Sequence, residues 1–401
     1  MTKELLKNNK TQIFYWLLAM LGISLAFPDY SLTSKTLGLL VIFWLFYNSL
    51  SQKINYLKQN KWAFLAVSIT FFLALIGSLY TDAYAEALIE LKHTILLFVI
   101  PLIIFSTDIH RKTAIFVLQY FSYAVVLTAI FSLIKGWYFK ANYLGDYLYY
   151  DKFGILIQKH TTYFALFVVL ALLFYLYDFL KLHQHKFINI IASIFLIYIL
   201  YILSNRISLV ALGIGGIILS LAYSKGKQKW LVIVAFPLLA YFLFTSPHFV
   251  KRFQPDIIHK QQVNDLKIRQ LHWKSVLETI LHKHQIIGGG TGGNRHYLYK
   301  RYKHYGLTAA YEEKYNAHNQ FLETALNFGW IGLTLFMSSL IYILWIFYRK
   351  KDFLALSILS TLLVFMLTES ILQRQSGLVI YALFISLFLY KNLIKAKTEN
   401  K

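Results

Sequence analysis

Long apolar runs separated by short basic turns constrain the fold of this chain more than any other feature. Of the 401 residues, 58% are apolar and only 14% are charged, whereas soluble domains average about 25% charged residues. Runs close to the roughly 18 residues needed to cross a bilayer recur along the whole sequence. They predict an all-α polytopic membrane protein with about twelve transmembrane helices. The expected spans are residues 13–27, 36–52, 62–81, 92–107, 113–135, 161–180, 187–204, 206–223, 230–246, 320–348, 353–370 and 375–391.

Basic residues in the turns between these spans indicate how the chain crosses the membrane. The 40 lysines and arginines exceed the 18 aspartates and glutamates, an excess that in a soluble protein would suggest a nucleic-acid partner. Here the positive charge of cytoplasmic loops explains much of it, so no nucleic acid is expected. The basic segments alternate along the chain, at residues 3–10, 53–61, 111–112, 181–186, 225–229, 349–351 and 391–401. Both termini are therefore expected in the cytoplasm, and residues 13–27 are expected to be a transmembrane helix rather than a cleaved signal peptide.

One long polar segment, residues 247–319, follows the ninth expected span. The orientation places it outside the cytoplasm, after transmembrane residues 1–246 and before residues 320–401, which hold three more spans and a cytoplasmic tail. Eight of the 13 histidines lie in it, together with many lysines and arginines. A basic, histidine-rich segment on one side of the bilayer is expected to handle an anion there.

Two short helices are expected in this segment. Apolar residues recur with helical period at 263–284, which predicts an amphipathic helix along the outer membrane surface. Its apolar face is predicted to comprise Leu266, Trp273, Val276, Leu277, Ile280 and Leu281. The glycine-rich residues 288–293 end this helix, and a second basic helix or turn is expected at 297–305. The glycine run lacks the Lys-Ser/Thr ending of a phosphate-binding loop, so Gly289 and Gly290 are expected to let backbone approach a ligand or a helix.

Four polar residues are predicted at one depth, near the outer ends of the spans. They are His160, Arg206, Glu369 and Arg374. Charged side chains at a helix centre in the membrane cost about 2.5–3.5 kcal/mol and mark functional sites by default. Taken singly, each of the four is explained equally well as a structural residue with a polar partner. Four polar residues at the same depth favour a functional site.

Arg206 and Arg269 are the candidates for binding an anion. A guanidinium is always charged and binds phosphate oxygens in a planar, bidentate geometry. Two such groups from different elements suit a diphosphate at the membrane surface. For Arg269, a solvated position on its amphipathic helix is an equally good interpretation, whereas Arg206 lies on the side that disfavours positive charge.

His318, where the chain returns to the membrane, is the candidate general base. An imidazole with an ordinary pKa of about 6.5 is mostly neutral at pH 7 and accepts a proton from a hydroxyl. The alternative is a structural role at a helix start, with Asn316 or Asn319 as the cap.

The polar segment lacks the pattern of a metal site, and no cofactor is expected. The chain has no cysteine, and His282 and His284, two residues apart, do not share a helix face. Its aromatic residues, Trp273 among them, fit either an interfacial belt or a platform on which sugar rings stack.

Three groups of residues resemble motifs of one family, the O-antigen ligases and polymerases of bacterial envelope glycan assembly. The sequence from His318 to Glu323, followed by Asn-Phe-Gly-Trp-Ile-Gly at 327–332, resembles its most recognisable motif. Upstream, Arg269-x-x-x-Trp273 leading to the glycine turn, and Ser-Asn-Arg ending at Arg206, resemble its two arginine motifs. The similarity covers residues 200–335 well and the N-terminal half by topology only.

The resemblance implies a GT-C-like, all-helical glycosyltransferase in the bacterial inner membrane, with its site facing the periplasm. Its donor would be a glycan on undecaprenyl diphosphate and its acceptor a hydroxyl of lipid A-core, as in an O-antigen ligase. By motif, Arg206 and Arg269 would bind the diphosphate and His318 would activate the acceptor, with inversion and without a metal. Asn319, which follows the base within the same motif, is expected to bind substrate. His160, Glu369 and Arg374 have no firm counterpart in the family and are expected at the site on physical grounds alone.

Several alternatives remain open from the sequence. A polymerase would use the same donor but take another lipid-linked repeat as acceptor, and a protein O-oligosaccharyltransferase would modify protein hydroxyls. A transporter or flippase is a more distant alternative, since such folds often show two similar halves with polar sites at mid-membrane, and no half-repeat is evident here. The partners expected in every case are membrane lipids and a lipid-linked glycan.

Overall fold

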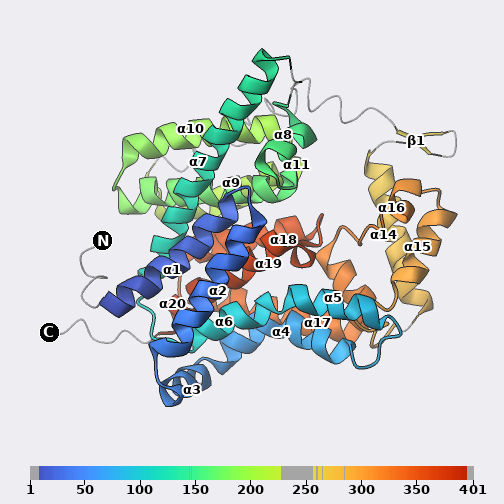
Figure 1. The fold of residues 1–401 in the computed structure, drawn as a ribbon, viewed down its shortest axis with the longest axis horizontal. Coiled ribbons are helices and arrows are strands. Elements are labelled where there is room, and N and C mark those ends of the chain that lie inside the picture. The colour runs from blue at the N-terminus through green and yellow to red at the C-terminus, as the bar shows by residue number, and fades with distance from the viewer. Residues whose placement is uncertain are drawn as a thin grey trace.

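The computed structural model describes residues 9–143, 145, 147–226, 256–258, 261–263, 265–283 and 285–394, which form an almost entirely helical structure (Figure 1). The elements before the polar segment are α1 (Asn9–Ala26), α2 (Tyr30–Tyr47), α3 (Leu50–Gln59), α4 (Lys61–Gly77), α5 (Tyr84–Thr94), α6 (Leu96–Phe105), α7 (Thr113–Ala141), α8 (Tyr150–Ile157), α9 (Thr161–Tyr177), η1 (Asp178–Leu182), α10 (Lys186–Leu203) and α11 (Arg206–Tyr223). The elements that follow are β1 (Asp256–Ile258), β2 (Gln261–Val263), α14 (Asp265–His282), α15 (Arg295–His304), α16 (Thr308–Glu312), α17 (Gln320–Arg349), α18 (Phe353–Met366), η2 (Ile371–Gln373), α19 (Gln375–Ile380), η3 (Tyr381–Ile385) and α20 (Ser386–Leu393). The two strands pair antiparallel as a hairpin, with Ile257 opposite Gln262.

The described helices have the length and apolar composition of membrane spans. Seven are long and apolar enough to cross a bilayer, the bent pair of α2 and α3 is an eighth if it counts as one span, and three more apolar helices are shorter. The protein is therefore an all-α polytopic membrane protein. The expected span at 230–246 lies outside the described residues, as do His248, His259 and His284.

Three expected spans have different boundaries in the structure. The span expected at 113–135 ends later, because α7 continues to Ala141. The span expected at 36–52 ends earlier, because Ser49 and Gln52 form a reciprocal capping box that starts α3 at an angle of 107° to α2. The span expected at 92–107 begins earlier, because α5 and α6 join at Ile95 into one apolar helix from Tyr84 to Phe105.

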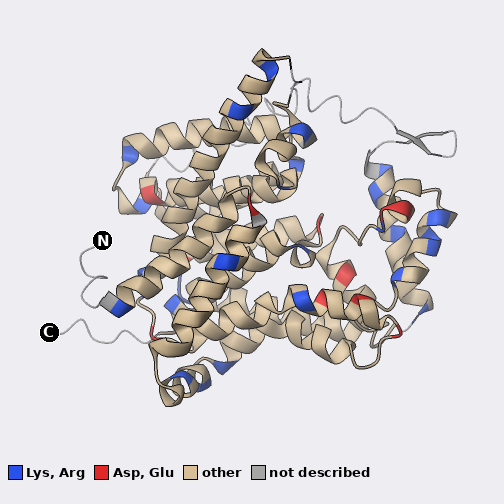
Figure 2. Cartoon of the chain, viewed as in Figure 1, with Lys and Arg blue, Asp and Glu red and all other residues tan. Residues whose placement is uncertain are grey.

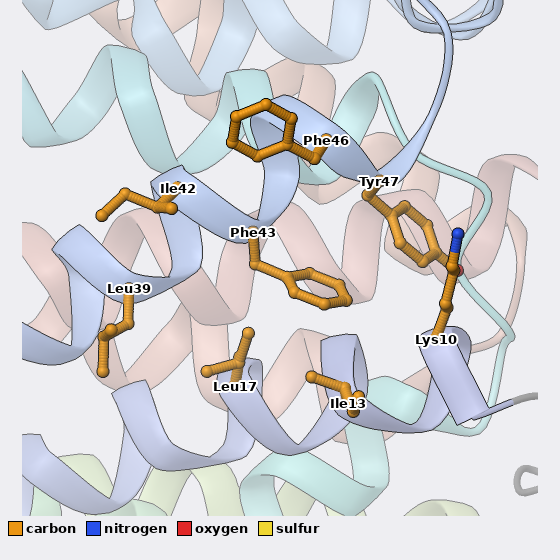
Figure 3. Close-up of a pocket in the computed structure, with 8 residues that line it drawn as sticks. All are labelled: Lys10, Ile13, Leu17, Leu39, Ile42, Phe43, Phe46 and Tyr47. Carbon is orange, nitrogen blue, oxygen red and sulfur yellow. The ribbon is translucent and has the colours of Figure 1, made fainter.

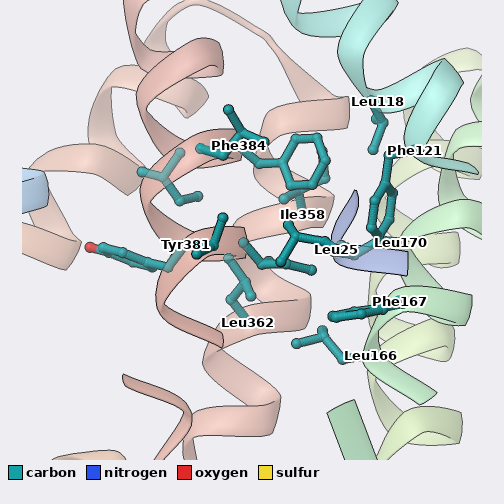
Figure 4. Close-up of a cluster of buried hydrophobic side chains, with 14 of the residues drawn as sticks. Leu25, Leu118, Phe121, Leu166, Phe167, Leu170, Ile358, Leu362, Tyr381 and Phe384 are labelled. Carbon is teal, nitrogen blue, oxygen red and sulfur yellow. The ribbon is translucent and has the colours of Figure 1, made fainter. Parts of the chain in front are cut away.

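The core of the molecule is built around α9, most of whose side chains are buried against α7, α10, α11 and α18. Figure 4 shows Phe121 of α7 between Phe167 of α9 and Phe384 of η3. The ring centroids lie 5.6 and 5.2 Å from Phe121, in edge-to-face geometry. Lipid tails are as apolar as these side chains, so the close fit stabilises the bundle mainly through van der Waals contact.

A shallow apolar groove lies between α1 and α2 (Figure 3). Apart from Lys10 and Tyr47 at one end, its lining is aliphatic and phenylalanine side chains. No residue predicted for the functional site lines it.

The helices α14, α15 and α16 form a small second core against the start of α17, with Tyr302 and Leu326 fully buried. The apolar face predicted for α14 is only partly right. Val276 and Ile280 are buried as expected, whereas Leu277 and Leu281 are 40% and 51% exposed. The packed face of α14 also carries three buried polar residues, His272, Ser275 and Thr279, which the predicted apolar face did not include.

Candidate functional site

The antiparallel packing of α11 against α18 determines which polar residues share one end of the bundle. At one end of this helix pair, the rings of Tyr223 and Phe353 lie 5.9 Å apart. Nearer the middle, the Ser357 hydroxyl donates to the Gly215 carbonyl at 3.0 Å. Arg206, the first residue of α11, therefore lies at the opposite end, where Glu369 follows α18.

His160 lies at the same end as Arg206. Its side chain caps α9 by accepting a hydrogen bond from the Thr162 backbone N–H at 3.3 Å. The Thr162 hydroxyl in turn accepts from the Asn205 amide at 3.2 Å, and Asn205 caps α11. The starts of α9 and α11 are thereby joined side by side.

His318 and Glu369 form the central pair of the site. The Nδ1 atom of His318 lies 3.2 Å from Oε2 of Glu369. Burial opposes the charged carboxylate, but the hydrogen bond and the positive potential of His318, with Arg269 and His160 beside it, lower the pKa of Glu369. A carboxylate only accepts hydrogen bonds, so Nδ1 is the donor in this contact and Nε2 is the ring nitrogen that can take up a further proton.

Arg269 joins the pair from α14. Its Nη1 atom donates to the Thr368 carbonyl at 3.0 Å, directly before Glu369. One turn further along α14, the His272 ring stacks on the His318 ring with centroids 5.9 Å apart. Burial lowers the pKa of His272 to about 4, helped by His318 and Arg269, so this imidazole is neutral near pH 7.

The backbone at His318 is strained. Its φ of +45° lies in the left-handed region, which residues other than glycine rarely adopt. Asn316 Oδ1 accepts the His318 N–H at 3.0 Å, and Asn319 caps α17 by accepting from the Phe321 and Leu322 N–H groups. Asn319 also donates to the Leu367 carbonyl, so its amide is engaged within the protein. Such strain persists where surrounding contacts hold a residue in place, and it is frequent at active sites.

The glycine run packs against helices. Gly290 has a φ of +77°, and a Cβ there would lie 2.5 Å from the Gly77 carbonyl of α4. A Cβ on Gly289 would lie 2.5 Å from the Asn294 side chain. Of the two uses expected for this run, close approach to a helix is the one observed, and a ligand contact stays a prediction.

Trp273 and Arg374 are placed differently from the central pair. The indole Nε1 of Trp273 is buried and has no hydrogen-bond partner within the described part of the chain. A buried donor without a partner costs free energy, so it marks a position where a ligand oxygen would be favourable. Arg374 follows Gln373 at the start of α19 and is exposed.

Sequence reasoning did not identify Arg295, which forms the most buried ionic cluster of this region. Its Nη2 atom lies 2.7 Å from Glu323 Oε1 and 3.4 Å from Glu90 Oε2. The usable signal was the presence of Glu90 and Glu323 beside apolar segments, since acids there require a partner.

Positive charge gathers on α14 and α15, as Figure 2 shows. Part of it is neutralised locally, because Glu278 accepts from Arg301 at 3.1 Å and lies 4.0 Å from Lys274. Within the described residues, no three His, Asp or Glu side chains gather as ligands for a metal ion.

One comparison with known proteins finds a similar family over part of the chain. Residues 191–337 match the family model described as O-Antigen ligase. The matched segment runs from α10 into α17 and contains Arg206, Arg269 and His318. Among curated proteins, none matches the chain. This match agrees with the resemblance in the motifs: residues 191–337 are similar to the O-antigen ligase family, and they lie in a chain whose described helices are those of a polytopic membrane protein.

Proposed function

We propose that this protein is an O-antigen ligase that moves a glycan from undecaprenyl diphosphate to a hydroxyl of lipid A-core. The reaction takes place at the periplasmic face, on the segment 247–319, with transmembrane helices before and after it and both termini in the cytoplasm. The positive-inside distribution of the loops supports this orientation.

The observation that carries the proposal is the 3.2 Å contact between His318 Nδ1 and Glu369 Oε2. A carboxylate on one ring nitrogen orients the imidazole and stabilises the imidazolium that forms when the other nitrogen takes a proton. His318 is also partly accessible, with 30% of its side chain exposed. Nε2 therefore accepts the proton of the acceptor hydroxyl.

The transfer step is a single displacement with inversion. The acceptor oxygen forms a bond to the anomeric carbon of the donor glycan while the bond from that carbon to the diphosphate oxygen breaks. The electron pair leaves with undecaprenyl diphosphate, and the hydroxyl proton stays on His318. Arg269, close to Glu369, and Arg206, at the same end of the bundle, stabilise the charge on the leaving diphosphate.

The other site residues bind the substrates. The Trp273 indole N–H donates to a glycan or phosphate oxygen, and its ring supports a sugar face. His160, Arg374, Asn319 and the turn at Gly289 and Gly290 line the path along which the glycan lies. Because undecaprenyl diphosphate is an activated leaving group, the step requires no ATP and no metal ion.

A reconstituted transfer assay tests the proposal. Purified protein in detergent receives a labelled lipid-linked glycan with lipid A-core, a second lipid-linked repeat or a peptide as acceptor. Product on lipid A-core alone supports a ligase, product on the lipid-linked repeat indicates a polymerase, and product on the peptide a protein glycosyltransferase. His318→Ala should abolish transfer, whereas His296→Ala, an exposed histidine of the same segment, should not. Transfer by His318→Ala at the wild-type rate would refute the mechanism.

A further inference from the structure

We infer that Arg295 is a positioning residue: with Glu90, Glu323 and Gln373 it forms a largely buried frame that fixes His318 and Glu369 relative to each other. This inference deepens the proposed function and rests on it for the catalytic meaning of the pair. The frame itself is defined by contacts that do not involve a substrate.

The Arg295 guanidinium is the centre of the frame. Its Nη2 atom donates to Glu323 Oε1 at 2.7 Å, to Gln373 Oε1 at 3.3 Å and to Glu90 Oε2 at 3.4 Å. These three acceptors come from α17, η2 and α5, while Arg295 is the first residue of α15. One side chain therefore joins four elements.

The acceptors are also joined to one another. Glu90 Oε1 accepts from the Gln373 amide at 3.0 Å and from the Asn327 amide at 3.1 Å. Together with its bond from Arg295, these contacts join Glu90 of α5 to α15, α17 and η2. The side chain of Glu323 is only 1% exposed, so water competes little for these bonds.

The frame reaches His318 through Glu323. While one oxygen of Glu323 accepts from Arg295, the other accepts the Ala317 backbone N–H at 2.9 Å. Ala317 is fully buried and precedes His318, whose φ of +45° is disfavoured. A hydrogen bond from the preceding residue to a buried carboxylate is one of the contacts that hold this conformation.

The frame reaches Glu369 through the turn after α18. Gln373, which contacts both Arg295 and Glu90, is the last residue of η2, the short helix that follows Glu369 in the chain. The same turn is fixed by its Leu372 N–H, which donates to Gln320 Oε1 at 2.8 Å on α17. Both members of the catalytic pair are therefore attached to the same buried cluster.

The charge of the frame favours a positioning role. Burial alone would disfavour the charged guanidinium, but attraction to Glu323 and Glu90 outweighs it and raises the pKa of Arg295. Apolar residues of similar volume often stabilise a core as well as a buried ion pair does. Hydrogen bonds add direction, and a displacement of about 1 Å at a reacting group can cost about 100-fold in rate.

The test compares Arg295→Met and Arg295→Lys, assayed as purified protein with a labelled lipid-linked glycan and lipid A-core. Arg295→Met should lower kcat about 100-fold while the KM for the donor stays within about twofold. Arg295→Lys keeps a cation and should recover at least about tenfold of that loss. Glu323→Leu should resemble Arg295→Met, and Glu323→Gln, which keeps an acceptor for Ala317 N–H, should lose less.

Hydrogen–deuterium exchange of backbone amides tests the frame independently of catalysis. In Arg295→Met the peptide that contains Ala317 should exchange about tenfold faster, while the middle of α9 stays protected. If Arg295→Met does not fold, Gln373→Leu removes an uncharged member of the frame instead. This variant should also lower kcat and speed exchange at Ala317, each by less than expected for Arg295→Met. Ser339→Ala is the matched control, because this buried hydroxyl of α17 donates to the Phe336 carbonyl of the same helix and to no other described residue.

The possible failures are distinguishable. Unchanged exchange at Ala317 in Arg295→Met and Gln373→Leu would overturn the frame, and so would a raised KM with an unchanged kcat, which indicates substrate binding by Arg295. Active His318→Ala together with faster exchange at Ala317 in Arg295→Met would instead refute the proposed mechanism and leave the frame supported.

Discussion

Glu369 lies 3.2 Å from His318, although 51 residues separate the two in the sequence. The contact joins the start of α17 to the turn after α18, and the Arg269 side chain bonds to the carbonyl directly before Glu369. An imidazole, a carboxylate and a guanidinium are thus held together at one end of a helical bundle.

Glu369→Gln should leave the fold intact but lower kcat about 100- to 10,000-fold. An amide can donate a hydrogen bond to Nδ1 and so favours the tautomer of His318 that carries its proton on Nε2. A neutral amide also does not stabilise the imidazolium that forms during transfer. Transfer kinetics with the lipid-linked donor measure this effect. Glu313→Gln, at an exposed acid of the same region, serves as the control, and equal rates for the two variants would exclude Glu369 from the mechanism.

Arg269→Lys should behave almost as poorly as Arg269→Ala. The flat guanidinium bonds to the Thr368 carbonyl while it faces the proposed diphosphate, and an ammonium cannot reproduce this forked geometry. We expect both variants to raise the KM for the donor and to lower kcat/KM at least about tenfold. Lys267→Ala, at an exposed position of the same helix, is the comparison. Full activity of Arg269→Lys would mean that charge alone is sufficient.

Acid should destabilise the protein through His272. Burial, with His318 and Arg269 nearby, lowers the pKa of His272 to about 4 in the folded protein, against about 6.5 when unfolded. As the pH falls, the unfolded chain therefore binds the proton before the folded protein does. The contribution of neutral, buried His272 to the free energy of unfolding is fully present above about pH 6.5 and is lost as the pH falls toward 4. The shift corresponds to about 3 kcal/mol. Melting temperatures in detergent should fall more steeply over this range for the wild type than for His272→Gln, and parallel curves would contradict the prediction.

Gly290→Ala should destabilise the protein by about 1–3 kcal/mol. The residue has a positive φ, and the added Cβ would meet the Gly77 carbonyl at 2.5 Å. Gly213→Ala provides the opposite case, because a Cβ on this α11 glycine meets nothing within 4 Å among the residues that the structure describes. In a helix interior that change should stabilise by about 0.5–1 kcal/mol. Thermal melts of both variants check the contrast, which would be refuted if Gly290→Ala melted at the wild-type temperature.

The sequence predicted the helical spans and the local structure around the site because both depend on near neighbours. Hydropathy located the described spans to within a few residues, except where a capping box at Ser49 or the junction at Ile95 changed a boundary and where α7 continues to Ala141. The helix expected at 263–284 is observed at Asp265–His282, and Asn319 caps α17 as one interpretation of His318 anticipated.

Tertiary structure alone decided which charged groups meet. Arg295 and Glu90 are separated by 205 residues, and nothing in the neighbourhood of either residue specifies the other. The same holds for His318 and Glu369, whose contact depends on how α17 and α18 pack. Apolar length and helix capping are properties of a short stretch of chain, so the sequence determined them directly. The pairing of buried charges is set by the packing of distant helices, because each charge requires a partner but any of several could have supplied it.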